Sequence, residues 1–100
     1  MPLNEELEET MSVFMVERNL KGISMEDLGG AQKAAITKAG EMRAAGTDIS
    51  YIRSTFAPND GRCMCLFEAN SPDDVKRLND ECGLPYHSVV EAMDLTPKSG

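Results

Sequence analysis

The sequence has 100 residues, of which 41% are hydrophobic and 27% are charged, and its formal net charge at pH 7 is −7. This composition is typical of one small soluble domain, whose limited core makes dimerisation a natural source of further stability. The negative charge and the lack of a basic stripe argue against nucleic-acid binding. No apolar run reaches the roughly 20 residues that a membrane-spanning helix needs.

The two ends of the sequence differ from its middle. Residues 1–11 carry four glutamates and little periodicity, so we expect an acidic, disordered tail. Residues 97–100 are expected to form a loose C-terminus, which leaves a single domain over residues 12–96. The start lacks the basic-then-apolar order of a secretory signal, and we therefore expect a cytoplasmic protein with reduced thiols.

The first half of the domain reads as a strand followed by a helix. Alternation of side-chain polarity and a high content of β-forming residues predict a strand over 12–18. Apolar residues then recur at intervals of three and four from Met25 to Met42, directly after Ser24, which is a suitable N-cap. This spacing predicts a helix that stops near Gly46.

The second half reads as a hairpin, a helix and a last strand. Runs at 48–57 and 62–69 predict two strands, and the sequence PNDG between them is a turn by composition. A second helix is expected to begin after Ser71 and to end at Gly83, and the last strand is predicted over 86–95. The order βαββαβ predicts an α+β, ferredoxin-like fold with a four-stranded antiparallel sheet in the order 4-1-3-2 and both helices on one face.

Alternation divides the strand residues between the two faces of this sheet. The face expected beneath the helices is uniformly apolar and comprises Phe14, Val16, Ile52, Phe56, Met64, Leu66, Val90 and Ala92. The other face mixes apolar residues with residues whose side chains can bind metals or take part in reactions: Val13, Met15, Glu17, Ile49, Tyr51, Arg53, Thr55, Cys63, Cys65, Phe67, His87, Val89, Glu91 and Met93. Since a large apolar patch is usually covered, we expect a homodimer that encloses a partly polar cavity between two sheets, as in dimeric α+β barrels.

The strand directions bring Glu17, Cys63 and His87 to one end of that second face. Thiols, an imidazole and carboxylates together suit nickel, zinc, copper or cobalt better than magnesium or calcium. We therefore predict a non-enzymatic protein with a divalent-metal site, nickel being the first candidate. The predicted ligands are Glu17, Cys63, Cys65, His87 and Glu91, and the predicted surrounding residues are Tyr51, Arg53 and Thr55.

Simpler interpretations of the same residues stay open. Cys63 and Cys65 are poorly spaced for a disulfide, because same-face neighbours in a strand lie about 6.5 Å apart at ~3.3 Å per residue. They could instead pack as small hydrophobic residues. His87 could serve only as a hydrogen-bonding group, and Glu17 could simply pair with Arg53 or Arg62.

The sequence contains no Gly-x-Ser-x-Gly, His-Glu-x-x-His, phosphate-binding glycine loop or dinucleotide fingerprint, and we assign no catalytic residue. The main alternative is a small-molecule enzyme or sensor that uses the inter-subunit cavity. In that case Arg53 and Tyr51 would orient an anionic substrate and His87 would act as a base. A further alternative is an interaction module whose uncovered face binds only a second copy.

Three blocks of the sequence, FMVERNLKGISMEDL, YIRSTFAPNDGRCMCLFEANS and GLPYHSVVEAMDLTP, resemble a family of short bacterial domains described as nickel-binding proteins or as domains of unknown function. The resemblance runs from about Phe14 to Pro97, and it implies a ferredoxin-like fold, a dimer and the binding of nickel ions. His87 falls where the family pattern varies. The blocks match the family at Glu17, Tyr51, Arg53, Cys63, Cys65 and Glu91.

Overall fold

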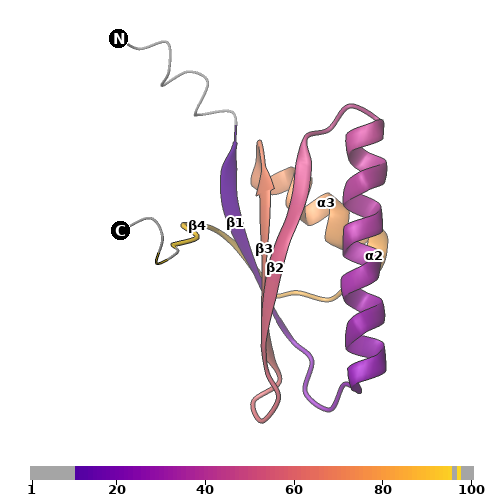
Figure 1. The fold of residues 1–100 in the computed structure, drawn as a ribbon, viewed down its shortest axis with the longest axis vertical. Coiled ribbons are helices and arrows are strands. Elements are labelled where there is room, and N and C mark those ends of the chain that lie inside the picture. The colour runs from indigo at the N-terminus through magenta and orange to yellow at the C-terminus, as the bar shows by residue number, and fades with distance from the viewer. Residues whose placement is uncertain (1–10, 96, 98–100) are drawn as a thin grey trace.

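The computed structural model describes residues 11–95 and 97, so almost all of the predicted tail and of the loose C-terminus lies outside the described residues. The elements follow the predicted order βαββαβ (Figure 1). They are β1 (Ser12–Asn19), α2 (Met25–Ala44), β2 (Ile49–Ala57), β3 (Arg62–Ala69), α3 (Pro72–Cys82) and β4 (Ser88–Ala92). Neither helix in this part of the chain is long and apolar enough to cross a membrane.

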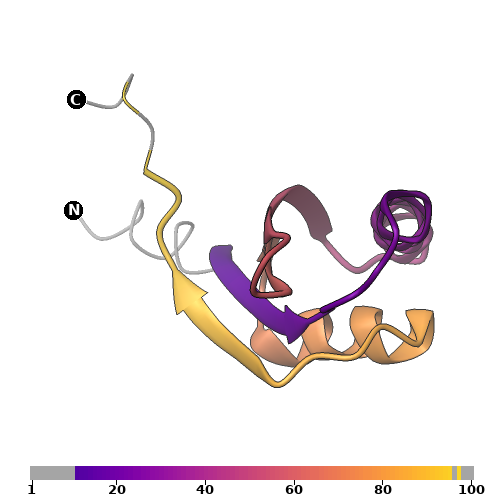
Figure 2. The same ribbon diagram turned by 90° about the horizontal axis from the view of Figure 1, so that it is seen from below.

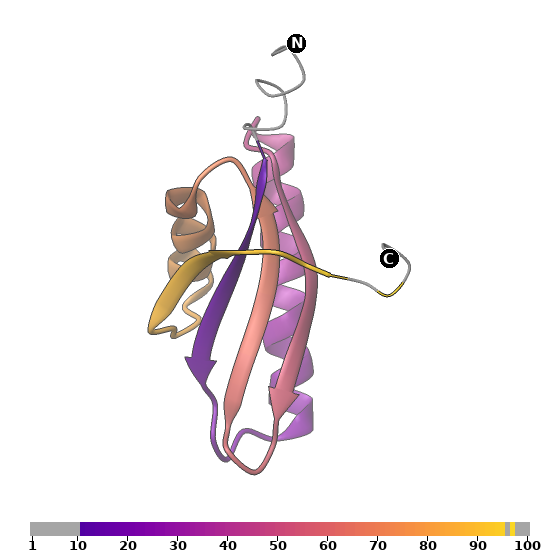
Figure 3. The same ribbon diagram turned by 90° about the vertical axis from the view of Figure 1, so that its left-hand side faces the viewer.

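The four strands form one sheet in the order β2-β3-β1-β4, and every neighbouring pair is antiparallel. This confirms the predicted topology. Both helices pack on the same side of the sheet (Figure 2), and the opposite side faces the viewer in Figure 3 with the helices behind it. We call the helix-covered side the core face. We call the other side the open face, which carries Val13, Met15, Glu17, Arg53, Thr55, Met64, Leu66, Val90 and Ala92.

Both helices begin and end as their sequences predict. Ser24 Oγ accepts a hydrogen bond from the backbone N–H of Asp27 at 3.0 Å, which caps α2. Ser71 Oγ accepts from the N–H of Asp74 at 3.2 Å in the same way and caps α3. Gly83 ends α3 with φ 70°, a left-handed conformation that glycine adopts without strain.

On β3 the two faces are the reverse of the predicted ones. Phe14 and Val16 of β1 are buried beneath the helices as expected, and their partners in the β1–β3 ladder are Phe67 and Cys65. Directly paired residues in an antiparallel sheet share a face, so the odd-numbered residues of β3 belong to the core. The residues moved to the core face are Cys63, Cys65 and Phe67, and those moved to the open face are Met64 and Leu66.

A register shift divides β2 into two halves of opposite phase. Tyr51 pairs with Phe67 on the core face, but the pairing shifts between Tyr51 and Arg53, and Arg53 then pairs with Leu66 on the open face. An extra residue in one strand reverses its alternation from that point on. The predicted positions of Ile49 and Tyr51 on the open face are therefore wrong, whereas Arg53 and Thr55 do lie there.

The phase of β4 also differs from the prediction. Val89 pairs with the buried Val16, and Val90 pairs with Met15 on the open face. Val90 is 46% exposed, which agrees with a position outside the core. The residues that thereby move to the core side are Val89 and Glu91, and those that move to the open face are Val90 and Ala92.

Candidate functional site

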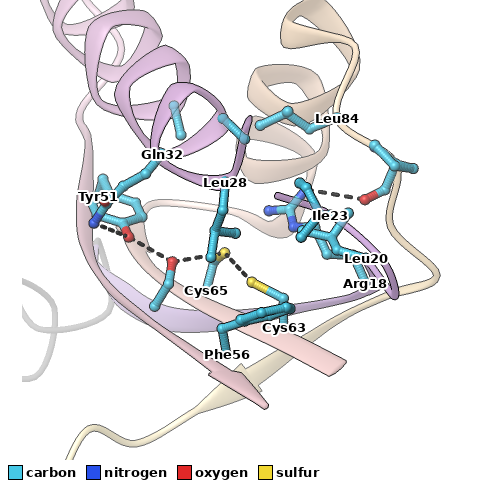
Figure 4. A pocket seen from close by; sticks show the side chains of 14 residues that line it. Arg18, Leu20, Ile23, Leu28, Gln32, Tyr51, Phe56, Cys63, Cys65 and Leu84 are labelled. Atoms are coloured by element: carbon cyan, nitrogen blue, oxygen red, sulfur yellow. Dashed lines mark hydrogen bonds between the residues drawn. The ribbon is translucent and has the colours of Figure 1, made fainter. Parts of the chain in front are cut away.

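A cavity of about 260 Å³ lies between α2 and the core face of the sheet. We call it the thiol cavity, because Cys63 and Cys65 line it from β3 (Figure 4). Among the residues that the structure describes, Arg18 is the one charged residue of its wall, and Gln32, Tyr51 and Ser54 are the other residues with polar side chains. Most of the remaining wall is apolar and includes Leu20, Ile23, Leu28, Ala31, Phe56 and Leu84.

The strand alternation of β3 directs both thiols to the same side. Cys63 and Cys65 are separated by one residue, and their Sγ atoms lie 3.8 Å apart. Both are free thiols that are nearly inaccessible from outside, with exposed fractions of 2% and 7%. The Cys-x-Cys pair is therefore part of the core of one chain, and the cavity it lines is not the inter-subunit cavity that the sequence led us to expect.

A chain of hydrogen bonds leads from α2 to these sulfur atoms. Gln32 Nε2 donates to the Tyr51 hydroxyl at 3.0 Å, and the Tyr51 and Ser54 hydroxyls are hydrogen-bonded to each other. Ser54 Oγ donates to Cys65 Sγ at 2.9 Å, so its oxygen accepts the hydrogen of Tyr51. Figure 4 draws these hydrogen bonds as dashed lines between Tyr51 and Cys65. Cys65 Sγ is the acceptor at the end of this chain.

Arg18 is a site residue that the sequence interpretation missed. Its side chain is only 3% exposed, and its guanidinium donates to Pro85 O at 3.1 Å and to Asn79 Oδ1 at 2.8 Å. None of the salt bridges among the described residues includes it. The alternation of β1 could have revealed it, because Phe14, Val16 and Arg18 are every second residue and therefore lie on the same face of the strand.

Burial and the neighbouring Cys65 raise the pKa of the Cys63 thiol to about 11, although the nearby Arg18 guanidinium lowers it again in part. Cys63 is therefore a neutral, protonated thiol at physiological pH. A metal ion that binds to this sulfur has to displace its proton, because the thiolate is the ligand.

The structure does not bring the five predicted ligands together. Glu17 lies on the open face, across the sheet from Cys63, and its carboxylate accepts a hydrogen bond from Arg62 Nε at 2.9 Å. His87 is exposed just before β4, where its backbone N–H donates to the carbonyl oxygen of Glu17 at 2.9 Å. Glu91 is exposed on β4, opposite the core residue Phe14. The reversed phase of β3 separates the thiols from Glu17, whereas His87 and Glu91 are separated from them because β1 lies between β3 and β4 and both side chains are exposed.

Among the described residues, no three histidine, cysteine, aspartate or glutamate side chains are close enough to hold one metal ion. Of the residues predicted to surround the metal, Tyr51 lines the thiol cavity. Arg53 instead lies on the open face and binds the carboxylate of Asp94, with an Nη1–Oδ1 distance of 2.6 Å. Thr55 is exposed on the same face. The thiol pair and Tyr51 are thus the part of the predicted site that lines this cavity.

Comparison with known proteins gives one family and one solved structure. The family model described as "Nickel responsive protein SCO4226-like" matches residues 14–92. The fold is similar to the crystal structure of SCO4226 from Streptomyces coelicolor A3(2), with a TM-score of 0.72 and 20% sequence identity over 85% of this chain and 100% of that chain. At that identity, the similarity supports the fold alone. No curated protein matches the chain.

Proposed function

The chain belongs to the SCO4226-like family of nickel-responsive proteins, and from this premise we propose that it is a homodimer that binds nickel or a related divalent transition-metal ion. The proposed protein ligands in each chain are the sulfur atoms of Cys63 and Cys65. Water or a small anion would complete the coordination. The proposal concerns binding alone and assigns no catalytic residue.

The distance between the two sulfur atoms carries this proposal. Two sulfur ligands that lie ~2.3 Å from one tetrahedral ion such as zinc are separated by about 3.8 Å, and around a square-planar nickel ion neighbouring ligands at this distance are about 3.3 Å apart. The Sγ atoms of Cys63 and Cys65 lie 3.8 Å apart before any metal is bound. Neither side chain would have to change its position greatly, because β3 already presents both on one face.

The charges in the cavity are also compatible with such an ion. Two thiolates neutralise a divalent cation, and a neutral complex is far less costly to bury than a free ion. The Arg18 guanidinium favours the thiolate form of Cys63, and the Ser54 hydroxyl donates to Cys65 Sγ. Metal ligation by Glu17, His87 and Glu91 stays a prediction, and it would require a site separate from the thiol cavity.

The open face supports the proposed homodimer. Met15 lies between Leu66 of β3 and Val90 of β4, and these apolar side chains form the centre of a face that neither helix covers. Two ion pairs lie at its margins, Glu17 with Arg62 and Arg53 with Asp94. A second copy placed face to face would remove the apolar centre from water and leave the charged margin accessible.

Calorimetric titration of nickel into metal-free protein tests the metal site. We expect binding in the wild type, and a loss of at least tenfold in affinity in both Cys63→Ser and Cys65→Ser. Cys82→Ser is the matched control, because Cys82 lies on α3, where its Sγ contacts Ala34 O at 3.6 Å, and does not line the thiol cavity. Cys82→Ser should bind nickel like the wild type.

Parallel titrations with zinc and cobalt show which ion the sulfur pair prefers. Tetrahedral cobalt also gives strong visible absorption, which would report the coordination directly. The proposed site would be excluded if the wild type bound none of the three ions. It would equally be excluded if Cys63→Ser and Cys65→Ser bound them as tightly as Cys82→Ser does.

A further inference from the structure

The positive charge of Arg18 lacks a counter-ion among the described residues. Its two hydrogen-bond acceptors, Pro85 O and Asn79 Oδ1, are both neutral, and none of the salt bridges among the described residues includes it. A buried charge is costly unless it is paired. An arginine that is 97% buried and lines a cavity therefore creates a position where an anion is favoured.

The rest of the cavity restricts what that anion can be. Leu20 and Ile23 line the cavity together with Arg18, and Leu28, Phe56 and Leu84 continue the apolar wall (Figure 4). Since Arg18 is the one charged residue of the wall, a dianion such as a phosphate monoester would bring a second negative charge without a cation to balance it. A singly charged group on an apolar body meets no such penalty. A carboxylate also matches the paired N–H groups of a guanidinium.

We propose that the thiol cavity binds a small apolar carboxylate, with its carboxylate against Arg18 and its hydrocarbon part between α2 and the sheet. A volume of about 260 Å³ corresponds to that of about nine water molecules at ~30 Å³ each. The cavity therefore accommodates a ligand of roughly ten non-hydrogen atoms. This inference does not depend on metal binding, because its anchor is Arg18 and not the thiol pair.

Octanoate, which has this size, is the probe, and octanol is its uncharged analogue. Both are titrated into metal-free wild-type protein, followed by calorimetry and by amide chemical shifts of α2 and β3. We expect octanoate to bind at least tenfold more tightly than octanol. Arg18→Met keeps much of the side-chain volume and removes the charge, so it should abolish this preference while octanol still binds. Arg18→Lys keeps the charge and should retain part of the preference.

Ala31→Phe provides a second measurement that leaves the contacts of Arg18 in place. Ala31 lines the cavity from α2, and a phenyl group at this position should fill it and weaken octanoate at least tenfold. If Arg18→Met does not fold, the affinities of Ala31→Phe and of the wild type for octanoate test the proposal instead. The proposal is overturned if the wild type binds octanoate no better than octanol, or if Ala31→Phe leaves octanoate binding unchanged. A failure to bind nickel would affect neither result, because these titrations contain no metal.

Discussion

Arg18, near the end of β1, donates a hydrogen bond from its guanidinium to Oδ1 of Asn79 in α3 over 2.8 Å. Both side chains are buried, and the Asn79 amide nitrogen in turn donates to Val75 O at 2.8 Å. The oxygen of the Asn79 amide therefore accepts a hydrogen bond from Arg18, and its nitrogen holds the side chain in place by a hydrogen bond within α3. This arrangement lets a small protein keep a cation beneath its helices.

Asn79→Ala should lower the free energy of unfolding by about 2–3 kcal/mol, because it leaves a buried charged donor without its side-chain acceptor. Urea denaturation measures the change. Thr47→Ala is the control, since it removes only the exposed 3.3 Å hydrogen bond from Arg77 and should cost less than about 0.5 kcal/mol. Equal losses in the two variants would show that the buried pair does not stabilise the fold.

The thiol of Cys63 should make the protein less stable at alkaline pH. Its pKa rises from an ordinary value of 9.0 to about 11 in the folded protein, so the folded state holds this proton more tightly than the unfolded state does. The resulting stabilisation is complete below pH 9 and is lost as the pH rises through 11. At about 1.4 kcal/mol per unit, the loss amounts to roughly 2–3 kcal/mol.

Urea denaturation of the reduced protein at pH 8 and at pH 11 measures this loss, with Cys63→Ala as the comparison. The variant lacks the thiol but keeps the lysines and tyrosines that also titrate in this range. The wild type should therefore lose more stability between the two pH values than the variant does. Identical losses would mean that the folded protein does not raise the Cys63 pKa.

Nickel binding should weaken as the pH falls. Because the pKa of Cys63 is about 11, a metal ion that binds its sulfur releases a proton at any pH below that value. The apparent affinity should then rise about tenfold per pH unit for each proton released. Calorimetry at pH 6, 7 and 8 in two buffers of different ionisation enthalpy measures both the affinity and the number of protons. Binding without proton release would exclude Cys63 as a ligand.

The element order could be predicted because its signals are local. Ser24 and Ser71 cap the two helices through their own first turns, and Gly83 ends α3 by its backbone conformation. Which face of β3 is buried, in contrast, does not follow from a local signal. Both faces of this strand are apolar, Met64 and Leu66 on one side and the thiols with Phe67 on the other, so alternation separates the two sets without showing which one the helices cover.

The candidate site was harder to predict for two further reasons. The register shift in β2 reverses the phase after Tyr51, and its sequence has no glycine or proline to mark it. Arg18 was missed because a charged residue at the end of a strand is normally expected in solvent, and its acceptor Asn79 lies far away in the sequence. The thiols were predicted as site residues, but the face on which they lie depends on packing against α2, which no local pattern encodes.

Leu66 and Met15 are paired on the open face, and a charge at Leu66 should prevent two copies from associating through it. Leu66→Glu should therefore be a folded monomer with the 10.9 kDa mass of one chain, whereas the wild type should have twice that mass in light scattering at micromolar concentration. Circular dichroism confirms that the variant is folded. A wild type of 10.9 kDa would contradict the proposed homodimer.

Ile36→Glu separates the effect of position from that of charge. Ile36 is 48% exposed on α2, on the helix side of the sheet, and its substitution adds the same negative charge to a chain that already carries −7. Electrostatic repulsion between acidic chains would weaken association equally in both variants. Loss of the dimer in Leu66→Glu alone therefore places the contact on the open face. Equal loss in both variants would show that repulsion, and not burial of this face, controls the association.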